Sequence, residues 1–227
     1  MKKHTRWMAL LLAGLITCST LSACNSSTPS NNEDDKEQTE SVSPFEDLTP
    51  SKIEGALRES NTFTIDYEIK RETSAESYSQ HRTYIINGDI LKATEATTSE
   101  HYNSNNEIYV DLKNQTQYSL NKGEWSATSA EVSLESLYTG ILIPDLLMNN
   151  ANYAEYDSQN DLSPLKEDAL RTHFQLKETV EVSGYMKVQK STYTFFFTFE
   201  GTSCTITIEF TAEKLTLPEV STSSATN

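Results

Sequence analysis

Apolar and polar side chains alternate with period two along residues 192–210, and this alternation constrains the fold more than any other feature of the sequence. Such a period places successive side chains on opposite faces of a strand. The turn-forming Glu200-Gly201-Thr202 separates two halves, so the segment predicts a β-hairpin with one dry face. We expect Phe196, on the other face, to be covered locally. The apolar parity comprises Tyr193, Phe195, Phe197 and Phe199, then Cys204, Ile206, Ile208 and Phe210.

Similar alternation recurs in the preceding chain. The clearest example is residues 63–70, and Asn87-Gly88 is a strong signal for a hairpin turn. A partner strand is expected to end at this turn and another to follow it. The full set of expected earlier strands is 63–70, 78–86, 89–98, 107–112, 116–120, 152–157 and 171–182.

Three segments have helical signals. Thr49 is a candidate cap with Pro50 in the first turn, and Ser51 with Glu54 offers an alternative capping box. This helix is expected to end by Asn61. Apolar residues at three- and four-residue spacing predict a helical insertion over 134–148, interrupted by a proline, and 163–170 is a third candidate.

The order of these elements predicts an α+β fold with a single domain over residues 45–218. We expect a curved, half-barrel-like antiparallel β-sheet, with a short N-terminal helix and the helical insertion packed on it. Cys204 shares the apolar parity of its strand, which indicates a buried side chain rather than a reactive thiol.

The N-terminus has the organisation of an export signal. Lys2, Lys3 and Arg6 precede an apolar run over residues 7–16. This run is shorter than the roughly 17–25 residues of a membrane-spanning helix. Residues 1–23 are therefore predicted to be a signal peptide.

The end of this segment, Leu21-Ser22-Ala23-Cys24, resembles the lipobox of bacterial lipoproteins. The resemblance implies cleavage between Ala23 and Cys24, and acyl chains on Cys24 that attach the protein to the extracytoplasmic face of the membrane. Cys18 does not fit, because bulky Ile16 occupies a position for a small residue. The alternative is an ordinary secretory signal with a cysteine near the cleavage site by chance.

Charge limits the partners of the processed chain. The formal net charge is −15, and loss of residues 1–23 removes three positive charges, which makes the processed chain more negative. Such a chain repels nucleic acid and anionic lipid. Residues 24–44 are polar and acidic and predict a disordered tether, and residues 219–227 predict a disordered tail. With Cys24 acylated, no intramolecular disulfide is possible.

Catalytic and metal-binding patterns are weak in this sequence. Two Ser-x-x-Lys matches, at 119–122 and 163–166, lack the Lys-Thr-Gly segment that accompanies them in penicillin-interacting enzymes. Asp66 and Glu68 share a strand face, which favours a solvated surface over an acid–base pair. His81, His101 and His173 are not at ligand spacing. We expect no enzyme activity, no metal and no cofactor.

The lipobox, the polar tether, a short helix, an antiparallel meander and an aromatic hairpin before Leu217-Pro218 resemble uncharacterised cell-surface lipoproteins of Gram-positive bacteria. Their layout is similar to that of the LolA/LppX/LprG type. Over residues 48–218, the resemblance implies a half-open barrel that binds acyl chains in its cleft.

The helical insertion and the aromatic hairpin together suggest a binding site for a lipid or another apolar small molecule. The residues predicted to contact it are Leu137, Ile141, Leu142, Leu146, Phe195 and Phe197. The alternative is an interaction module for a neighbouring envelope protein, with a filled core and an exposed apolar or tyrosine patch. We expect a monomer in either case.

Overall fold

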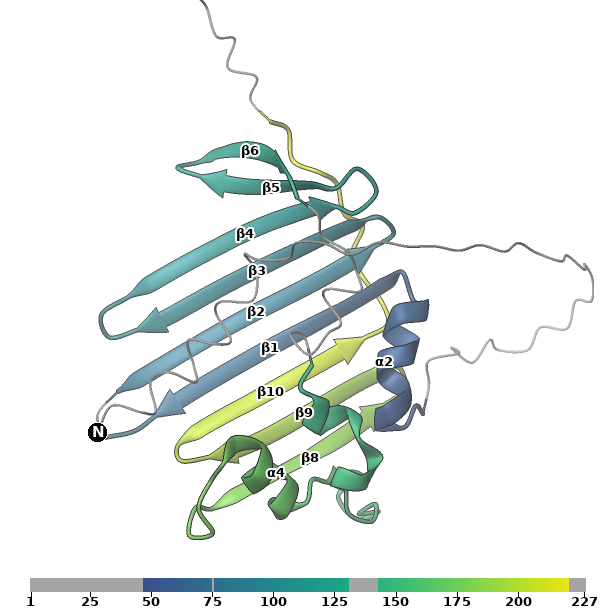
Figure 1. Ribbon diagram of the computed structural model, residues 1–227, viewed down its shortest axis with the longest axis vertical. Helices are drawn as coiled ribbons and strands as arrows, with labels where there is room; N and C mark the ends of the chain where they lie inside the picture. Colours follow the sequence, from purple (N-terminus) through teal and green to yellow (C-terminus); the bar gives the residue numbers. More distant parts are fainter. Residues whose placement is uncertain (1–46, 75, 131–142, 221–227) are drawn as a thin grey trace, which may run out of the picture.

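The computed structural model describes residues 47–74, 76–130 and 143–220 (Figure 1). The predicted signal peptide, the lipobox with Cys24 and the tether lie outside these ranges. So do three of the predicted ligand contacts, Leu137, Ile141 and Leu142, and most of the predicted tail.

Ten antiparallel strands form one curved, open sheet, which confirms the predicted fold class (Figure 1). Its order is β6-β5-β4-β3-β2-β1-β10-β9-β8-β7, so the first and last long strands pair at the centre. The strands are β1 Thr62–Glu72, β2 Ser77–Asn87, β3 Ile90–Ser99, β4 Asn103–Asp111, β5 Thr116–Asn121, β6 Glu124–Ser129, β7 Ser163–Pro164, β8 Val182–Gln189, β9 Thr192–Phe199 and β10 Thr202–Glu209.

The described helices are α2 Pro50–Glu59, α4 Glu167–Phe174 and the 3-10 turns η1 Asp145–Met148 and η2 Asn150–Asn152. They lie over β8, β9, β10 and one end of β1 (Figure 1). We call the face they cover the inner face. Ile53 of α2 and Leu147 of η1 join Phe63 and Phe195 of the sheet in one core, all with 0% exposure.

The cap of α2 differs from the prediction. The Thr49 side chain makes no capping hydrogen bond. Instead, the Ser51 backbone N–H donates to Asn150 Oδ1 at 3.0 Å, and Asn150 Nδ2 donates to Ser51 Oγ at 2.9 Å. The start of α2 is thus satisfied by a residue of η2, 99 positions away.

Two predicted strands around residues 152–182 were wrong, and the predicted helix between them begins later than expected. Residues 152–157 form isolated bridges at Tyr153 and Asp157 rather than a strand. Ser163-Pro164 is the strand β7, and the helix begins only at Glu167. Acidic side chains in the first turn suit the positive end of the helix dipole, as Glu167 and Asp168 do here. The predicted strand over 171–182 is replaced by the end of α4 and a loop.

Other predictions of side-chain environment are confirmed. Cys204 is 5% exposed, and burial raises the pKa of its thiol to about 12. Phe196 is covered by Tyr185, with ring centroids 5.3 Å apart in a stacked arrangement.

Gly201 occupies a turn that no side chain fits. Its φ is +73°, and an added Cβ would lie 2.4 Å from the backbone oxygen of Glu72. Gly88 also has a positive φ, +63°, but no described atom lies within 4 Å of its Cβ position. We therefore expect Gly201→Ala to lower the free energy of unfolding more than Gly88→Ala, whose left-handed backbone alone costs about 1–2 kcal/mol.

Urea unfolding of the unanchored chain, meaning residues 24–227 with Cys24→Ser, measures both variants. The Gly201 backbone oxygen also accepts the N–H of Glu72 at 2.8 Å, so displacement of this turn disturbs the end of β1. An equal decrease in the free energy of unfolding in the two variants would contradict the close contact between position 201 and the Glu72 backbone oxygen.

Candidate functional site

Polar side chains interrupt the inner face of the sheet between β1 and β3. The register places Tyr67 opposite Arg82, Arg82 opposite Glu95, and Gln80 opposite Thr97. These positions alternate with outward-facing residues and share their face with buried Phe63 and Ile65. We call these five residues, Tyr67, Gln80, Arg82, Glu95 and Thr97, the polar strip.

The polar strip is built around an ion pair. Arg82 Nε lies 2.8 Å from Glu95 Oε2, and the two side chains are 10% and 22% exposed. Gln80 Nε2 donates to Thr97 Oγ1 at 3.4 Å, and both residues are buried. Opposite charges that face each other compensate when water is excluded. The Arg82–Glu95 pair therefore contributes no net charge to the strip.

Tyr67 supplies a polar atom that the rest of the described protein does not satisfy. Its hydroxyl is buried and has no hydrogen-bond partner among the described residues. The ring packs edge-on against Tyr84, with centroids 6.1 Å apart. Burial raises the pKa of Tyr67 well above its ordinary value, so the hydroxyl keeps its proton. An unpaired buried donor costs about 1–3 kcal/mol.

Apolar side chains flank the polar strip on two sides. Toward the end of β2, Ile86 pairs with Leu91 of β3 on one side and with Phe63 of β1 on the other. Across the sheet, Tyr67 pairs with Ile206, which pairs with Phe195. The inner face thus combines a large, buried apolar area with one compact polar area.

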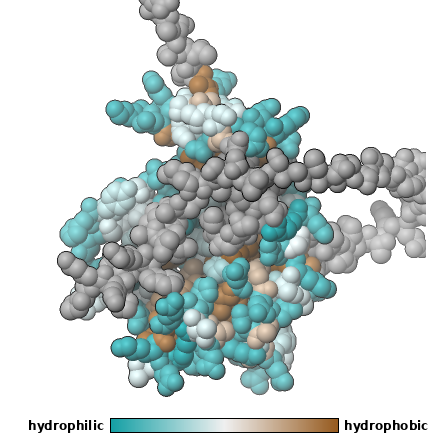
Figure 2. Space-filling model, viewed as in Figure 1, coloured by the Kyte–Doolittle hydropathy of each residue, from teal (hydrophilic) through white to brown (hydrophobic). Residues whose placement is uncertain are grey.

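The predicted ligand contacts that the structure describes lie in the packed part of the inner face. Leu146, Phe195 and Phe197 are buried. Phe197 lies against Phe174 of α4, with ring centroids 5.2 Å apart. Figure 2 shows apolar residues at the surface in this lower half of the view, among the helices. Their role in ligand contact stays a prediction.

The candidate catalytic residues lie on the outer face and do not form a catalytic arrangement. Thr83 Oγ1 donates to Asp66 Oδ1 at 2.6 Å, and His81 Nε2 lies 3.5 Å from the same oxygen. The carboxylate is therefore the central group, whereas a nucleophilic triad places the imidazole between acid and nucleophile. Glu68 pairs with Lys70 at 2.7 Å.

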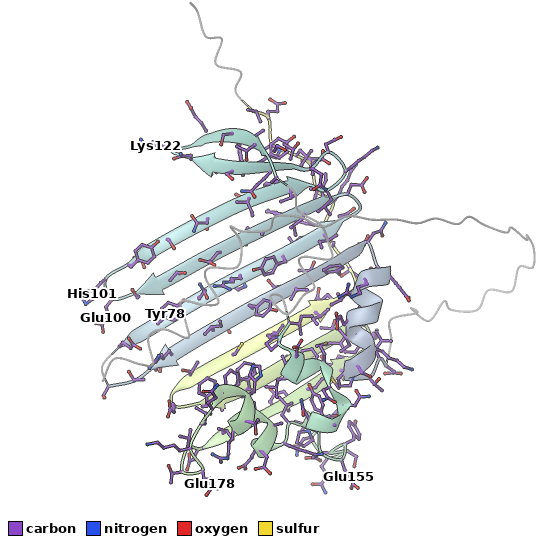
Figure 3. All side chains as sticks on the ribbon, viewed as in Figure 1. Tyr78, Glu100, His101, Lys122, Glu155 and Glu178 are labelled. Atoms are coloured by element: carbon purple, nitrogen blue, oxygen red, sulfur yellow. The ribbon has the colours of Figure 1, made fainter. Side chains whose placement is uncertain are left out.

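The lysines of the two Ser-x-x-Lys matches lie in different parts of the described structure. Lys166 Nζ donates to the backbone oxygen of Ala151 at 2.8 Å. Lys122 lies at the tip of the β5–β6 hairpin, and His101 lies in the turn after β3 (Figure 3). Within the described residues, no three His, Cys, Asp or Glu side chains gather into a potential metal site.

A hollow of about 730 Å³ opens where β8 begins and β9 ends, beside α4 and away from the polar strip. Val180, Val182 and Phe199 contribute apolar surface, and glutamates such as Glu178 surround them. Arg171 lies in the same lining but is held by Glu167 at 3.0 Å and by the Lys177 backbone oxygen at 3.1 Å. The sequence analysis did not identify this hollow.

The solved structures to which this chain is similar include a distant mycobacterial one. The crystal structure of LprF from Mycobacterium bovis is similar over 74% of this chain and 96% of that chain, with 11% sequence identity and a TM-score of 0.35. No family model matches the chain, and no curated protein does. At this level the similarity adds nothing to what the strand order already shows.

The polar strip was missed in the sequence, although a signal was present. The expected strand over residues 78–86 has Tyr84 and Ile86 on one parity, and Gln80 and Arg82 share that parity. Polar residues at buried positions are unusual unless they are paired, so they mark a candidate site.

In the part of the chain that the structure describes, no helix is long and apolar enough to span a membrane.

Proposed function

We propose that this chain is a non-catalytic binding protein of the bacterial cell envelope, attached to the membrane through acyl chains on Cys24. Its ligand is a lipid or another apolar small molecule, held against the inner face of the sheet. The observation that carries the proposal is the juxtaposition of a buried polar strip with apolar rows on one face.

The side chains of the described rows support such a ligand. Leu91, Ile86 and Phe63 continue the apolar surface on one side of the strip. A hydroxyl or carbonyl at the end of the ligand would supply the hydrogen-bond acceptor that Tyr67 lacks among the described residues.

Native mass spectrometry of the unanchored chain tests this function. We expect a fraction of the purified protein to carry an additional mass, and lipid extraction to release an apolar compound of that mass. Incubation of the delipidated protein with 1-oleoylglycerol should restore a one-to-one complex. A protein that stays free of ligand before and after incubation would contradict the proposal.

The alternative, a docking module for a neighbouring envelope protein, has less support from the described surface. Among the described residues, the exposed large apolar side chains, Tyr102, Leu120, Tyr156 and Val220, belong to separate segments of the chain. Tyr102 lies in the turn after β3, Leu120 in β5 and Tyr156 in the loop before β7. A docking surface needs such residues to be contiguous, so the binding function is preferred.

A further inference from the structure

We infer that the polar strip receives an uncharged, oxygen-bearing head group, and that Tyr67 donates a hydrogen bond to it. This inference rests on the proposed function, which requires only that an apolar body binds to the inner face. It adds the chemical class of the polar end and the residue that recognises it.

The first step is the geometry of Tyr67. Its register partners are Arg82 on β2 and Ile206 on β10, so the side chain projects from the inner face at the boundary between polar and apolar residues. The residue is 9% exposed, and its hydroxyl has no partner within the described ranges. A hydroxyl in this position is satisfied by an acceptor oxygen that arrives with a ligand.

The second step concerns charge. Arg82 and Glu95 compensate each other at 2.8 Å, and Arg71, further along β1, lies 2.9 Å from Glu76. An anionic head group would approach the Glu95 carboxylate, and a cationic head group would approach the Arg82 guanidinium. Either charge would lose its hydration without gaining an unopposed partner, which makes its burial unfavourable.

The third step is the remaining chemistry of the strip. Gln80 and Thr97 offer an amide and a hydroxyl, which both donate and accept hydrogen bonds. Tyr78 precedes Gln80 on the same face and lies near the start of β2 (Figure 3). Uncharged groups of this kind match hydroxyl, ester or amide oxygens. The ligand class is therefore a neutral amphiphile, with its chain along the apolar rows.

The test compares three probes that share an oleoyl chain: uncharged 1-oleoylglycerol, anionic oleate and cationic oleylamine. Each is titrated into the delipidated unanchored chain, into Tyr67→Phe, and into Tyr102→Phe as a matched control at an exposed position. We expect the unsubstituted chain to prefer 1-oleoylglycerol. Tyr67→Phe should weaken that complex about 3- to 10-fold, the range of one hydrogen bond, and Tyr102→Phe should leave it unchanged.

A second variant tests the charge argument. Glu95→Gln removes the carboxylate that opposes an anionic head group, so the affinity for oleate should rise relative to that for 1-oleoylglycerol. Denaturation of the ligand-free proteins gives an independent readout. Tyr67→Phe should leave the midpoint unchanged or raise it, because the lost hydroxyl has no described partner.

The outcomes separate the inference from the proposed function. Failure of all three probes to bind would overturn both. Equal binding of the three probes, with no effect of Tyr67→Phe, would overturn the inference and leave the apolar binding function in place. A lower denaturation midpoint for ligand-free Tyr67→Phe would also overturn it, because the hydroxyl would then have a partner without ligand.

Discussion

Cells that express Cys24→Ser are expected to produce a chain that incorporates no labelled palmitate, whereas the unsubstituted chain is labelled. The thiol of Cys24 is the predicted attachment point for the diacylglyceryl group, and serine cannot form the thioether. Buried methylenes contribute about 0.8 kcal/mol each, so two or three acyl chains hold a protein on a bilayer where one chain does not. Loss of the label should therefore be complete.

Cys18→Ser is the matched control for this experiment, because Cys18 lies in the same predicted signal segment. The bulky Ile16 two positions before it excludes Cys18 from the lipobox pattern, so this variant should be labelled like the original chain. An inhibitor of the lipoprotein signal peptidase should leave residues 1–23 attached and increase the apparent size. Label that persists in Cys24→Ser would contradict the anchor.

The elements that were predicted correctly are those whose signal is local. In β1, β9 and β10, the buried side chains apart from Cys204 are large, and their neighbours apart from Phe196 are polar, so the alternation is readable within one strand. The turn at Gly88 has the positive φ that Asn-Gly indicates. These features depend on backbone geometry and on burial, and both determine which residue types occur at consecutive positions.

The strand β8 was missed because its inner face includes a glycine. A Cβ at Gly184 would lie 2.8 Å from the backbone oxygen of Phe196 and 2.9 Å from Leu165 Cδ1. The segment at Leu165 lies so close to β8 that only a residue without a side chain fits at position 184. The glycine interrupts the apolar alternation of Val182, Met186 and Val188. The cause lies in a distant segment, so the strand itself does not reveal it.

Long-range contacts also decided the start of α4 and the cap of α2. Ser163-Pro164 has the form of a helix start, but it pairs with Met186 and Tyr185 of β8. Likewise, the side chain of Asn150, rather than that of Thr49, accepts a hydrogen bond from a backbone N–H at the start of α2. The polar strip is an intermediate case, since Arg82 stands out in the sequence while its neighbour Glu95 is identified only by the strand register.

Phe195→Ala is expected to be the most destabilising single substitution in the described core. Phe195 has no exposed surface and lies at the centre of the inner face, between Ile206 of β10 and Met186 of β8. Truncation of a buried phenylalanine removes apolar contacts and leaves a cavity, which costs about 3–5 kcal/mol. For a domain of this size, that loss is a large part of the total stability. Urea unfolding of the unanchored chain, followed by far-UV circular dichroism, gives the change.

Phe196→Ala provides the control, because it removes the same group from the next residue of the same strand. Phe196 is half-buried on the outer face, where its ring stacks on Tyr185 alone among the described aromatic residues. Solvent can fill the space that the ring leaves, so no buried cavity forms. The free energy of unfolding should therefore fall by about half as much as in Phe195→Ala, or less. A similar loss in both variants would mean that both faces of β9 are packed equally. The division between a core-forming inner face and a solvated outer face, on which the binding proposal depends, would then be wrong.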